Sequence, residues 1–139
     1  MSQSELEELG KSQSAYMRAA GLILTAAGGT EVRGYLDLGP EHHTPFGVVH
    51  GGVYASAVET AASFGASLAV QDRNQFAVGV HNATDFLRSM TDGRVSLVAT
   101  PIQQGRTQQL WLVVLTRDSD DKAVARGQVR LQNVPLPGA

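Results

Sequence analysis

The stretch that decides the fold is FGVVHGGVYASAVETAASFGASLAV, residues 46–70. After His50 its only formal charge is Glu59, in a run made mostly of small and apolar residues. The run is about as long as a membrane-spanning helix, but its carboxylate, serines and glycines make it far less apolar than such a helix. A helix enclosed by protein on most sides has this composition, because small residues let neighbouring backbones approach closely. The stretch therefore predicts a central core helix that begins at 51–52 and ends at 69–71.

The segments around this helix have the pattern of β-strands. Residues 30–38 follow a Gly28-Gly29 break and alternate apolar and polar side chains, which predicts a first strand. Four further segments rich in Val, Leu and Thr are separated by turn signals, and we predict strands at 76–86, 94–103, 107–117 and 123–134. The last of these alternates regularly between polar and apolar residues, as in an antiparallel sheet with one buried face.

The whole pattern predicts one α+β domain over residues 1–139, in which an antiparallel sheet of five to six strands wraps around one long helix. Residues 1–29 are predicted to be an N-terminal helical segment, and 135–139 a short tail. Such a sheet leaves edges that need covering, so we expect dimerisation to extend it.

Composition excludes several classes of function. The chain has 11 Lys and Arg against 13 Asp and Glu, and the basic residues are scattered, so neither nucleic acid nor an anionic membrane is an expected partner. The absence of Cys excludes disulfides, thiolate metal sites and a Cys nucleophile. The first residues, MSQSELEELGK, are acidic and polar, unlike a signal peptide, and we expect a cytoplasmic protein.

A motif in the loop and helix resembles a known family. HTPFGVVHGG (43–52) is followed by Glu59 nine positions after His50 and by Ser63 four positions later. The order and spacing of further segments are also similar, namely AVGV (77–80), FLRS (86–89), GR (105–106), QLW (109–111) and VARG (124–127). Over residues 30–134 the chain resembles the hotdog-fold acyl-CoA thioesterases of the phenylacetate-pathway branch. It is most similar to the 1,4-dihydroxy-2-naphthoyl-CoA and 4-hydroxybenzoyl-CoA thioesterases with a helix Glu, and looks like an actinobacterial member.

Glu59 is the candidate catalytic residue. A carboxylate shielded from water in a small-residue helix is costly unless it is paired or used, and shielding strengthens it as a base. The alternative is a structural glutamate satisfied by serine or backbone donors. The resemblance favours catalysis, with Glu59 as general base or nucleophile.

The start of the helix supplies the other expected catalytic groups. The unpaired N–H groups and positive dipole at a helix start stabilise a developing oxyanion, and we expect Gly51 N–H to be that donor. His50 is expected to contact the thioester oxygen or to orient its neighbours. A metal site at the histidines is rejected, because no carboxylate or Cys stands at a recognised ligand spacing.

The resemblance implies roles for two hydroxyl residues. Ser63, one helical turn beyond Glu59, is expected to hold the attacking water. Thr44 stands where related enzymes carry Asn or Gln, and its shorter side chain implies a different rate or substrate choice. His43 is a candidate to replace that contact.

The resemblance also implies how coenzyme A binds. The expected contacts lie on the strand end Phe86, Leu87, Arg88 and Ser89, and on the turn Gly105, Arg106 and Thr107, where Arg88 and Arg106 would hold phosphates. No separate cofactor is expected, because CoA is part of the substrate. Related sites lie between two subunits, so a homodimer is expected, assembled further into a dimer of dimers.

The predicted function is hydrolysis of an aromatic or medium-sized acyl-CoA to the free acid and CoA. One alternative is a protein that binds acyl-CoA without turnover. The other is a hotdog hydratase or dehydratase, whose sites pair an Asp with a catalytic His in a different arrangement.

Overall fold

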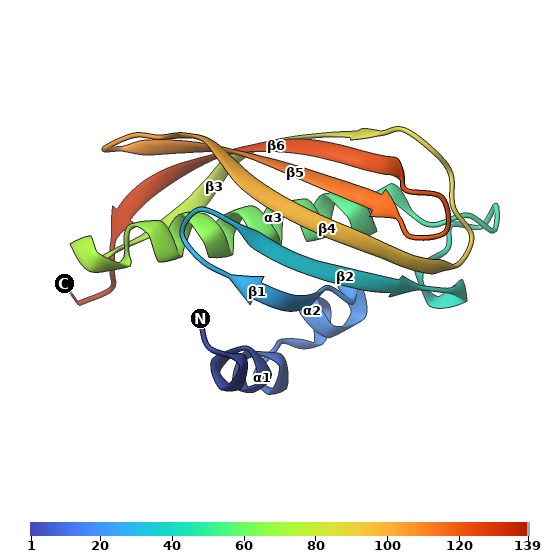
Figure 1. Cartoon of the computed structure of the whole chain (residues 1–139), viewed down its shortest axis with the longest axis horizontal. Helices are drawn as coiled ribbons and strands as arrows, with labels where there is room; N and C mark the ends of the chain where they lie inside the picture. Colours follow the sequence, from blue (N-terminus) through green and yellow to red (C-terminus); the bar gives the residue numbers. More distant parts are fainter. Residues whose placement is uncertain (139) are drawn as a thin grey trace.

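A six-stranded antiparallel sheet curves around one long helix in the computed structural model, which describes residues 1–138 (Figure 1). The strands are β1 (Ile23–Ala27), β2 (Val32–Leu38), β3 (Gln75–Phe86), β4 (Gly93–Gln104), β5 (Gln108–Arg117) and β6 (Lys122–Pro135). They lie side by side in the order β1-β2-β4-β5-β6-β3. The predicted α+β class is therefore confirmed, with β1 and β3 as the two edges of the sheet.

The central helix is α3 (Gly51–Ala69), in agreement with the predicted bounds. Two shorter helices, α1 (Gln3–Lys11) and α2 (Ala15–Ala20), precede the sheet, and the 3₁₀ turns η1 (Pro40–His42) and η2 (Gln71–Arg73) flank α3. Each of the first two helices begins at a serine whose hydroxyl accepts a backbone N–H, Ser2 for α1 and Ser14 for α2. No helix within residues 1–138 is both long and apolar enough to cross a membrane.

The N-terminal segment departs from the sequence prediction. Residues 1–29 were expected to be helical, but the helices end at Ala20, and Ile23–Ala27 forms the edge strand β1. The run Leu22-Ile23-Leu24 is a short apolar segment that periodicity alone does not assign to helix or strand. Pairing with β2 decides its conformation.

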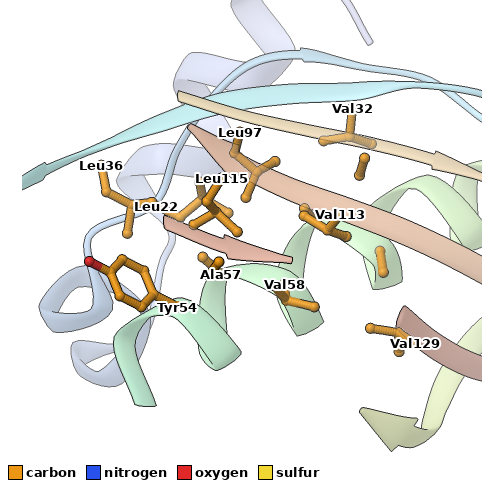
Figure 2. Packing of buried hydrophobic residues seen from close by; sticks show 14 of the residues in the cluster. Leu22, Val32, Leu36, Tyr54, Ala57, Val58, Leu97, Val113, Leu115 and Val129 are labelled. Carbon is orange, nitrogen blue, oxygen red and sulfur yellow. The ribbon is translucent and has the colours of Figure 1, made fainter. Parts of the chain in front are cut away.

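The core lies between the concave face of the sheet and one side of α3. Figure 2 shows Leu97, Val113 and Leu115 directed from the sheet toward Ala57 and Val58 of the helix. The helix is made of small residues on this side, so its backbone lies close to the strands. Trp111, fully buried, packs against Gly65 and donates its Nε1–H to Gln109 Oε1 at 2.9 Å.

The two ends of the sheet carry different loops. The loop before α3, the β3–β4 connection and the β5–β6 turn lie at one end (right in Figure 1). The β4–β5 turn lies at the other end, beside the C-terminal end of α3. This division determines which of the predicted site residues are neighbours.

Candidate active site

The start of α3 presents one backbone donor that the chain does not use. His50 precedes the helix in an extended conformation, and its Nδ1 accepts the Gly52 N–H at 2.7 Å. The Val53 N–H donates to the His50 carbonyl at 3.0 Å. Gly51 N–H has no acceptor among residues 1–138. Because the positive end of the helix dipole lies here, this N–H is positioned to bind a ligand oxygen.

His50 also offers a donor at the same place. Since Nδ1 accepts a hydrogen bond, the proton of the neutral ring is on Nε2. The ring is exposed, so Nε2–H is free to donate to a second ligand atom. This histidine was expected to act at the helix start, and the hydrogen bond from Gly52 N–H to its Nδ1 is the contact that orients the ring.

A pocket of about 320 Å³ beside this helix start, the Phe86 pocket, gathers most of the residues expected to contact CoA. It is lined by Val49, Gly51, Tyr54, Phe86, Leu87, Arg88 and Ser89. The Phe86 ring, 57% exposed, lies directly over Gly51. Arg88 donates from Nη1 to the Ala123 carbonyl at 2.6 Å, which holds its side chain at this end of the sheet. The structure thus brings the predicted oxyanion donor and the predicted strand-end residues together.

Glu59 lies in the middle of α3, on the flank that faces β3. Its carboxylate contacts the backbone of Gly79 so closely that a Cβ at position 79 would lie 2.6 Å from Oε1. Oε2 is buried and has no hydrogen-bond partner among residues 1–138. A buried carboxylate oxygen normally has a donor, so this oxygen can accept a hydrogen bond from a group outside residues 1–138.

The contacts around Glu59 fix the helix to β3. Asn82 Nδ2 donates to the Ala55 carbonyl at 3.1 Å, and the Ser67 hydroxyl accepts the Ala77 N–H at 3.0 Å. Ser63 stands between these two contacts, one turn beyond Glu59, and is only partly buried. The expected pair of Glu59 and Ser63 therefore shares one flank of a rigidly held helix.

Thr44 is engaged within its own loop. Its Oγ1 accepts the Phe46 N–H at 3.2 Å, and its backbone N–H donates to the Val48 carbonyl at 2.8 Å. The Phe46 side chain is 91% exposed. His43 donates from Nε2 to the Thr91 carbonyl, so each residue has one of its polar functions engaged, while the Thr44 hydroxyl proton and His43 Nδ1 have no hydrogen-bond partner within residues 1–138.

The turn expected to contact CoA phosphates lies far from the helix start of the same chain. Asn133 Nδ2 donates to the carbonyls of Gly105 and Arg106 at 3.3 and 3.2 Å, and this turn is at the opposite end of the sheet (Figure 1). Gly105, Arg106 and Thr107 are therefore not brought together with Gly51 in one protomer.

Glu59 is also separated from Gly51 along the helix. Eight residues at a rise of 1.5 Å place them roughly 12 Å apart. The carboxylate of one chain therefore does not reach a carbonyl held at its own Gly51 N–H. Within residues 1–138, no three His, Asp or Glu side chains come close enough together to hold a metal ion.

Two contributors to this region were not singled out from the sequence. Gly79 leaves the space that the Glu59 carboxylate occupies, because it has no side chain. The sequence contained a signal for this contact, since an isolated Gly within a strand pattern indicates that another group approaches the backbone closely. Tyr16 of α2 shares a hydrogen bond with Ser56 of α3 at 2.5 Å. No local pattern indicates that contact, because 40 residues separate its partners.

Comparisons with known proteins identify the family and agree with the fold. The family model described as Thioesterase superfamily matches residues 46–124. A Mycobacterium tuberculosis protein described as an esterase, Rv1847, is 47% identical over 116 residues, 82% of each chain. The solved structure of that protein superimposes with a TM-score of 0.84, covering 88% of this chain and 98% of the other.

Two further relatives are named as thioesterases. The proofreading thioesterase EntH of Cronobacter sakazakii is 30% identical over 68% of this chain and 69% of its own. A mutant of the Pseudomonas aeruginosa thioesterase PA1618 has a structure with a TM-score of 0.86 and 28% identity, covering 97% of both chains. The chain described here therefore belongs to the hotdog thioesterase superfamily and is a thioester hydrolase.

Proposed function

We propose that this enzyme hydrolyses an aromatic or medium-sized acyl-CoA to the free acid and CoA, with Glu59 as the catalytic base or nucleophile. The observation that carries the proposal is the Glu59 carboxylate, which lies against Gly79 with one buried oxygen that no donor in residues 1–138 satisfies. A structural glutamate would have such a donor. The Ser and backbone donors that the alternative requires are absent at this oxygen in the described residues.

The site is completed by a second copy of the chain. Strand β3 is a twelve-residue edge with nothing on its outer side in one protomer, and it exposes Val78 and Val80. Such an edge is a template for another strand. Pairing of β3 with its symmetry mate, which also extends the sheet as expected, brings the two copies of α3 together.

The contacts within one chain indicate where the twofold axis passes. Ala55 is midway between Gly51 and Glu59 on α3, and its carbonyl is bound by Asn82 of β3. Antiparallel pairing of two β3 strands centred near Asn82 would bring Ala55 of both helices to the axis. Glu59 of one protomer would then lie level with Gly51 of its partner.

The chemistry follows from these groups. The substrate carbonyl oxygen accepts from Gly51 N–H and His50 Nε2–H, which stabilise negative charge on it during attack. As a base, Glu59 removes a proton from a water held by Ser63, and the resulting hydroxide adds to the carbonyl carbon. The carbon–sulfur bond then breaks, and the CoA thiolate takes a proton. As a nucleophile, Glu59 would add to the carbonyl carbon and displace the CoA thiolate as the carbon–sulfur bond breaks, and water would then cleave the resulting anhydride to the free acid and the Glu59 carboxylate.

The remaining expected residues bind the CoA portion in this scheme. Arg88 at the mouth of the Phe86 pocket is one candidate for the phosphates. Because the Gly105 to Thr107 turn lies at the opposite end of the sheet, its contact with CoA requires another protomer. A dimer of dimers remains the expected assembly.

Thiol release from a panel of acyl-CoA and aryl-CoA esters tests the function. The wild-type enzyme should release thiol, and Glu59→Gln should lower kcat/KM about 10³-fold, since it keeps the shape and removes the base. Glu31→Gln, an exposed carboxylate at the β1–β2 turn, is the matched control and should retain full activity. Binding of the esters by both proteins with no thiol released would establish a binding protein instead.

Mixing two inactive variants tests the shared site. Gly51→Pro removes the N–H at a helix position that tolerates proline. Gly51→Ala is the control for it, because this variant keeps the N–H and also adds side-chain atoms that contact Phe86. A mixture of Glu59→Gln and Gly51→Pro should regain about a quarter of wild-type activity, because half the dimers are mixed and each has one intact site. No recovery after subunit exchange would place both groups in one chain.

A further inference from the structure

Asn133, near the end of β6, is a buried polar residue with no role in the proposed reaction. Its side-chain Nδ2 donates to the carbonyls of Gly105 and Arg106 at 3.3 and 3.2 Å. Its backbone N–H donates to the Thr107 carbonyl at 2.8 Å. This one residue therefore binds all three carbonyl oxygens of the turn between β4 and β5.

Asn133 is itself held from the interior of the protein. Its Oδ1 accepts a hydrogen bond from Gln109 Nε2 at 2.9 Å, and the same nitrogen donates to the Ala66 carbonyl in the last turn of α3 at 2.9 Å. Gln109 is almost fully buried, and its Oε1 accepts from Trp111 Nε1 and from Gln104 Nε2. Both amide side chains use all of their N–H donors, so the orientation of Asn133 is fixed by the network.

The direction of the carbonyls decides what the turn can offer to a ligand. The backbone N–H groups of Arg106 and Thr107 have no acceptor among residues 1–138, and both residues are exposed. The Arg106 guanidinium adds further donors. Because the carbonyl oxygens are already bound by Asn133, the groups left for a ligand are mainly donors. Backbone N–H groups of a turn together with a guanidinium suit the oxygens of a phosphate.

We propose that Asn133 is a positioning residue that keeps the carbonyls of this turn away from bound CoA, so that the phosphate oxygens of CoA meet donors. This inference rests on the proposed function, in which the turn contacts CoA held by another protomer. Without the Asn133 side chain, the Gly105 and Arg106 carbonyls lose their donor and are free to rotate toward the ligand. A carbonyl oxygen that faces a phosphate oxygen repels it. Asn133 therefore acts on CoA binding through the turn and not on the thioester.

A pair of substrates tests whether the effect lies at the phosphates. The CoA ester and the pantetheine ester of one acyl group share the thioester, but only the CoA ester carries phosphates. Asn133→Ala should lower the ratio of kcat/KM for the CoA ester to that for the pantetheine ester about tenfold, through KM, because charge-assisted hydrogen bonds are lost. An equal loss for both esters would show a merely structural role and would overturn the proposal.

A neighbouring residue supplies the matched control. Gln132 is adjacent to Asn133 on β6, but its side chain accepts from Gln108 and makes no hydrogen bond with the turn. Gln132→Ala should keep the wild-type ratio, and the same fall in both variants would contradict a particular role of Asn133. Asn133→Leu, which has the branched shape of asparagine, takes the place of Asn133→Ala if that variant does not fold.

Amide exchange measured by NMR observes the turn without any turnover. Saturating CoA should slow solvent exchange of the Arg106 and Thr107 amides in the wild-type enzyme at least about tenfold, because both N–H groups become bound. The protection should fall about fivefold in Asn133→Ala. Exchange that CoA does not slow in wild type, or slows equally in both proteins, would overturn the proposal.

The two experiments separate this proposal from the proposed function. If the wild-type enzyme releases no thiol from any ester but CoA protects the two amides, and protects them less in Asn133→Ala, the function is wrong and the role of Asn133 is supported. If thiol is released but the amides stay unprotected, the function is supported and the role of Asn133 is refuted.

Discussion

The two edges of the sheet end in different ways. At one edge β1 is five residues long, its pairing with β2 shifts register between Leu24 and Ala26, and α1 packs against it. At the other edge β3 is twelve residues long, pairs with β6 along its length with one register shift between Gly79 and His81, and has no neighbour on its outer side within residues 1–138. A short and covered strand ends a sheet, whereas a long exposed one can continue it.

The catalytic candidates follow the same division. Glu59 lies against Gly79 of β3, and the contacts of Asn82 with Ala55 and of Ser67 with Ala77 fasten α3 to that strand. No candidate site residue lies on β1. In the proposed function, the edge that pairs with a second copy of the chain is the edge that holds the carboxylate, which couples assembly to activity.

Among the variants that compare the two edges, charging the open edge is expected to have the largest effect. Val80→Lys places a charge on the exposed face of β3 and should convert the dimer to a monomer, with kcat/KM reduced at least about 100-fold because each site is left incomplete. Ile23→Lys makes the same change at a comparably exposed position of β1 and should leave the assembly intact. Sedimentation and thiol-release assays measure both; a fully active monomeric Val80→Lys would refute the coupling.

A pair of glycine substitutions separates activity from stability. Gly79→Ala puts a Cβ within 2.6 Å of the Glu59 carboxylate, which must move, so kcat should fall about 10- to 100-fold with little loss of stability. Gly34→Ala on β2 meets the Ile23 backbone carbonyl at 2.5 Å and should lower the free energy of unfolding by about 1–3 kcal/mol. Chemical denaturation and steady-state kinetics are measured on both variants. A loss of stability in Gly79→Ala with a loss of kcat in Gly34→Ala would contradict the prediction.

A third variant concerns the Tyr54 hydroxyl, one of three buried side-chain atoms without a hydrogen-bond partner in residues 1–138, beside Glu59 Oε2 and Gln75 Oε1. The Tyr54 hydroxyl is buried without a partner in residues 1–138, and the Tyr54 ring lies in the core with its centroid 6.4 Å from that of Phe86, the last residue of β3. Tyr54→Phe should raise the free energy of unfolding by about 1 kcal/mol, because no hydrogen bond is lost. Glu59→Gln, in contrast, is expected to lower activity, because it removes the catalytic carboxylate. Lower stability of Tyr54→Phe would indicate that an unseen partner satisfies the hydroxyl.

The same hydroxyl gives a pH dependence. Burial raises the pKa of Tyr54, so the folded state disfavours the phenolate. The stability that this proton affinity contributes is complete below the pKa of the unfolded tyrosine and is lost as pH rises through and above it. Unfolding measured from pH 8 to 11 should therefore show a steeper loss in wild type than in Tyr54→Phe, and parallel curves would contradict this.

The smallest effect is expected at an exposed ion pair between β2 and β4. Arg94 donates two hydrogen bonds to Asp37, which lowers the pKa of that carboxyl. Its contribution is present above the pKa of the unfolded aspartate and is lost as pH falls through the folded value. Asp37→Asn should thus lose slightly less stability than wild type between pH 6 and pH 2 in thermal melts. A large difference would show that the pair is less solvated than its exposure indicates.

Much of this architecture could be predicted from residue pattern. The bounds of α3 followed from a run of small residues with a single charge, and the last strands followed from alternation and turn residues. Strand β1 was missed, because a three-residue apolar run after a helical segment carries no period of its own. The position of β3 beside β6 depends on tertiary pairing between residues as far apart as Gln75 and Pro135, which local pattern does not encode.

The candidate site divides in the same way. Gly51, His50 and Glu59 stood out because charge and glycine are conspicuous in a core helix. The Phe86 to Ser89 strand end was expected from resemblance, and the fold brings it to Gly51. Tyr16 was not expected, since its contact with Ser56 exists only because a separate short helix folds over the start of α3.

Trp111 of β5 is the single tryptophan of the chain, and its ring is fully buried against Gly65 of the central helix. Its indole environment is set by how α3 rests on the sheet, so its emission reports on that one contact without interference from another fluorophore of its kind. The protein therefore contains its own optical probe of helix seating, usable in every variant proposed above without attaching a label.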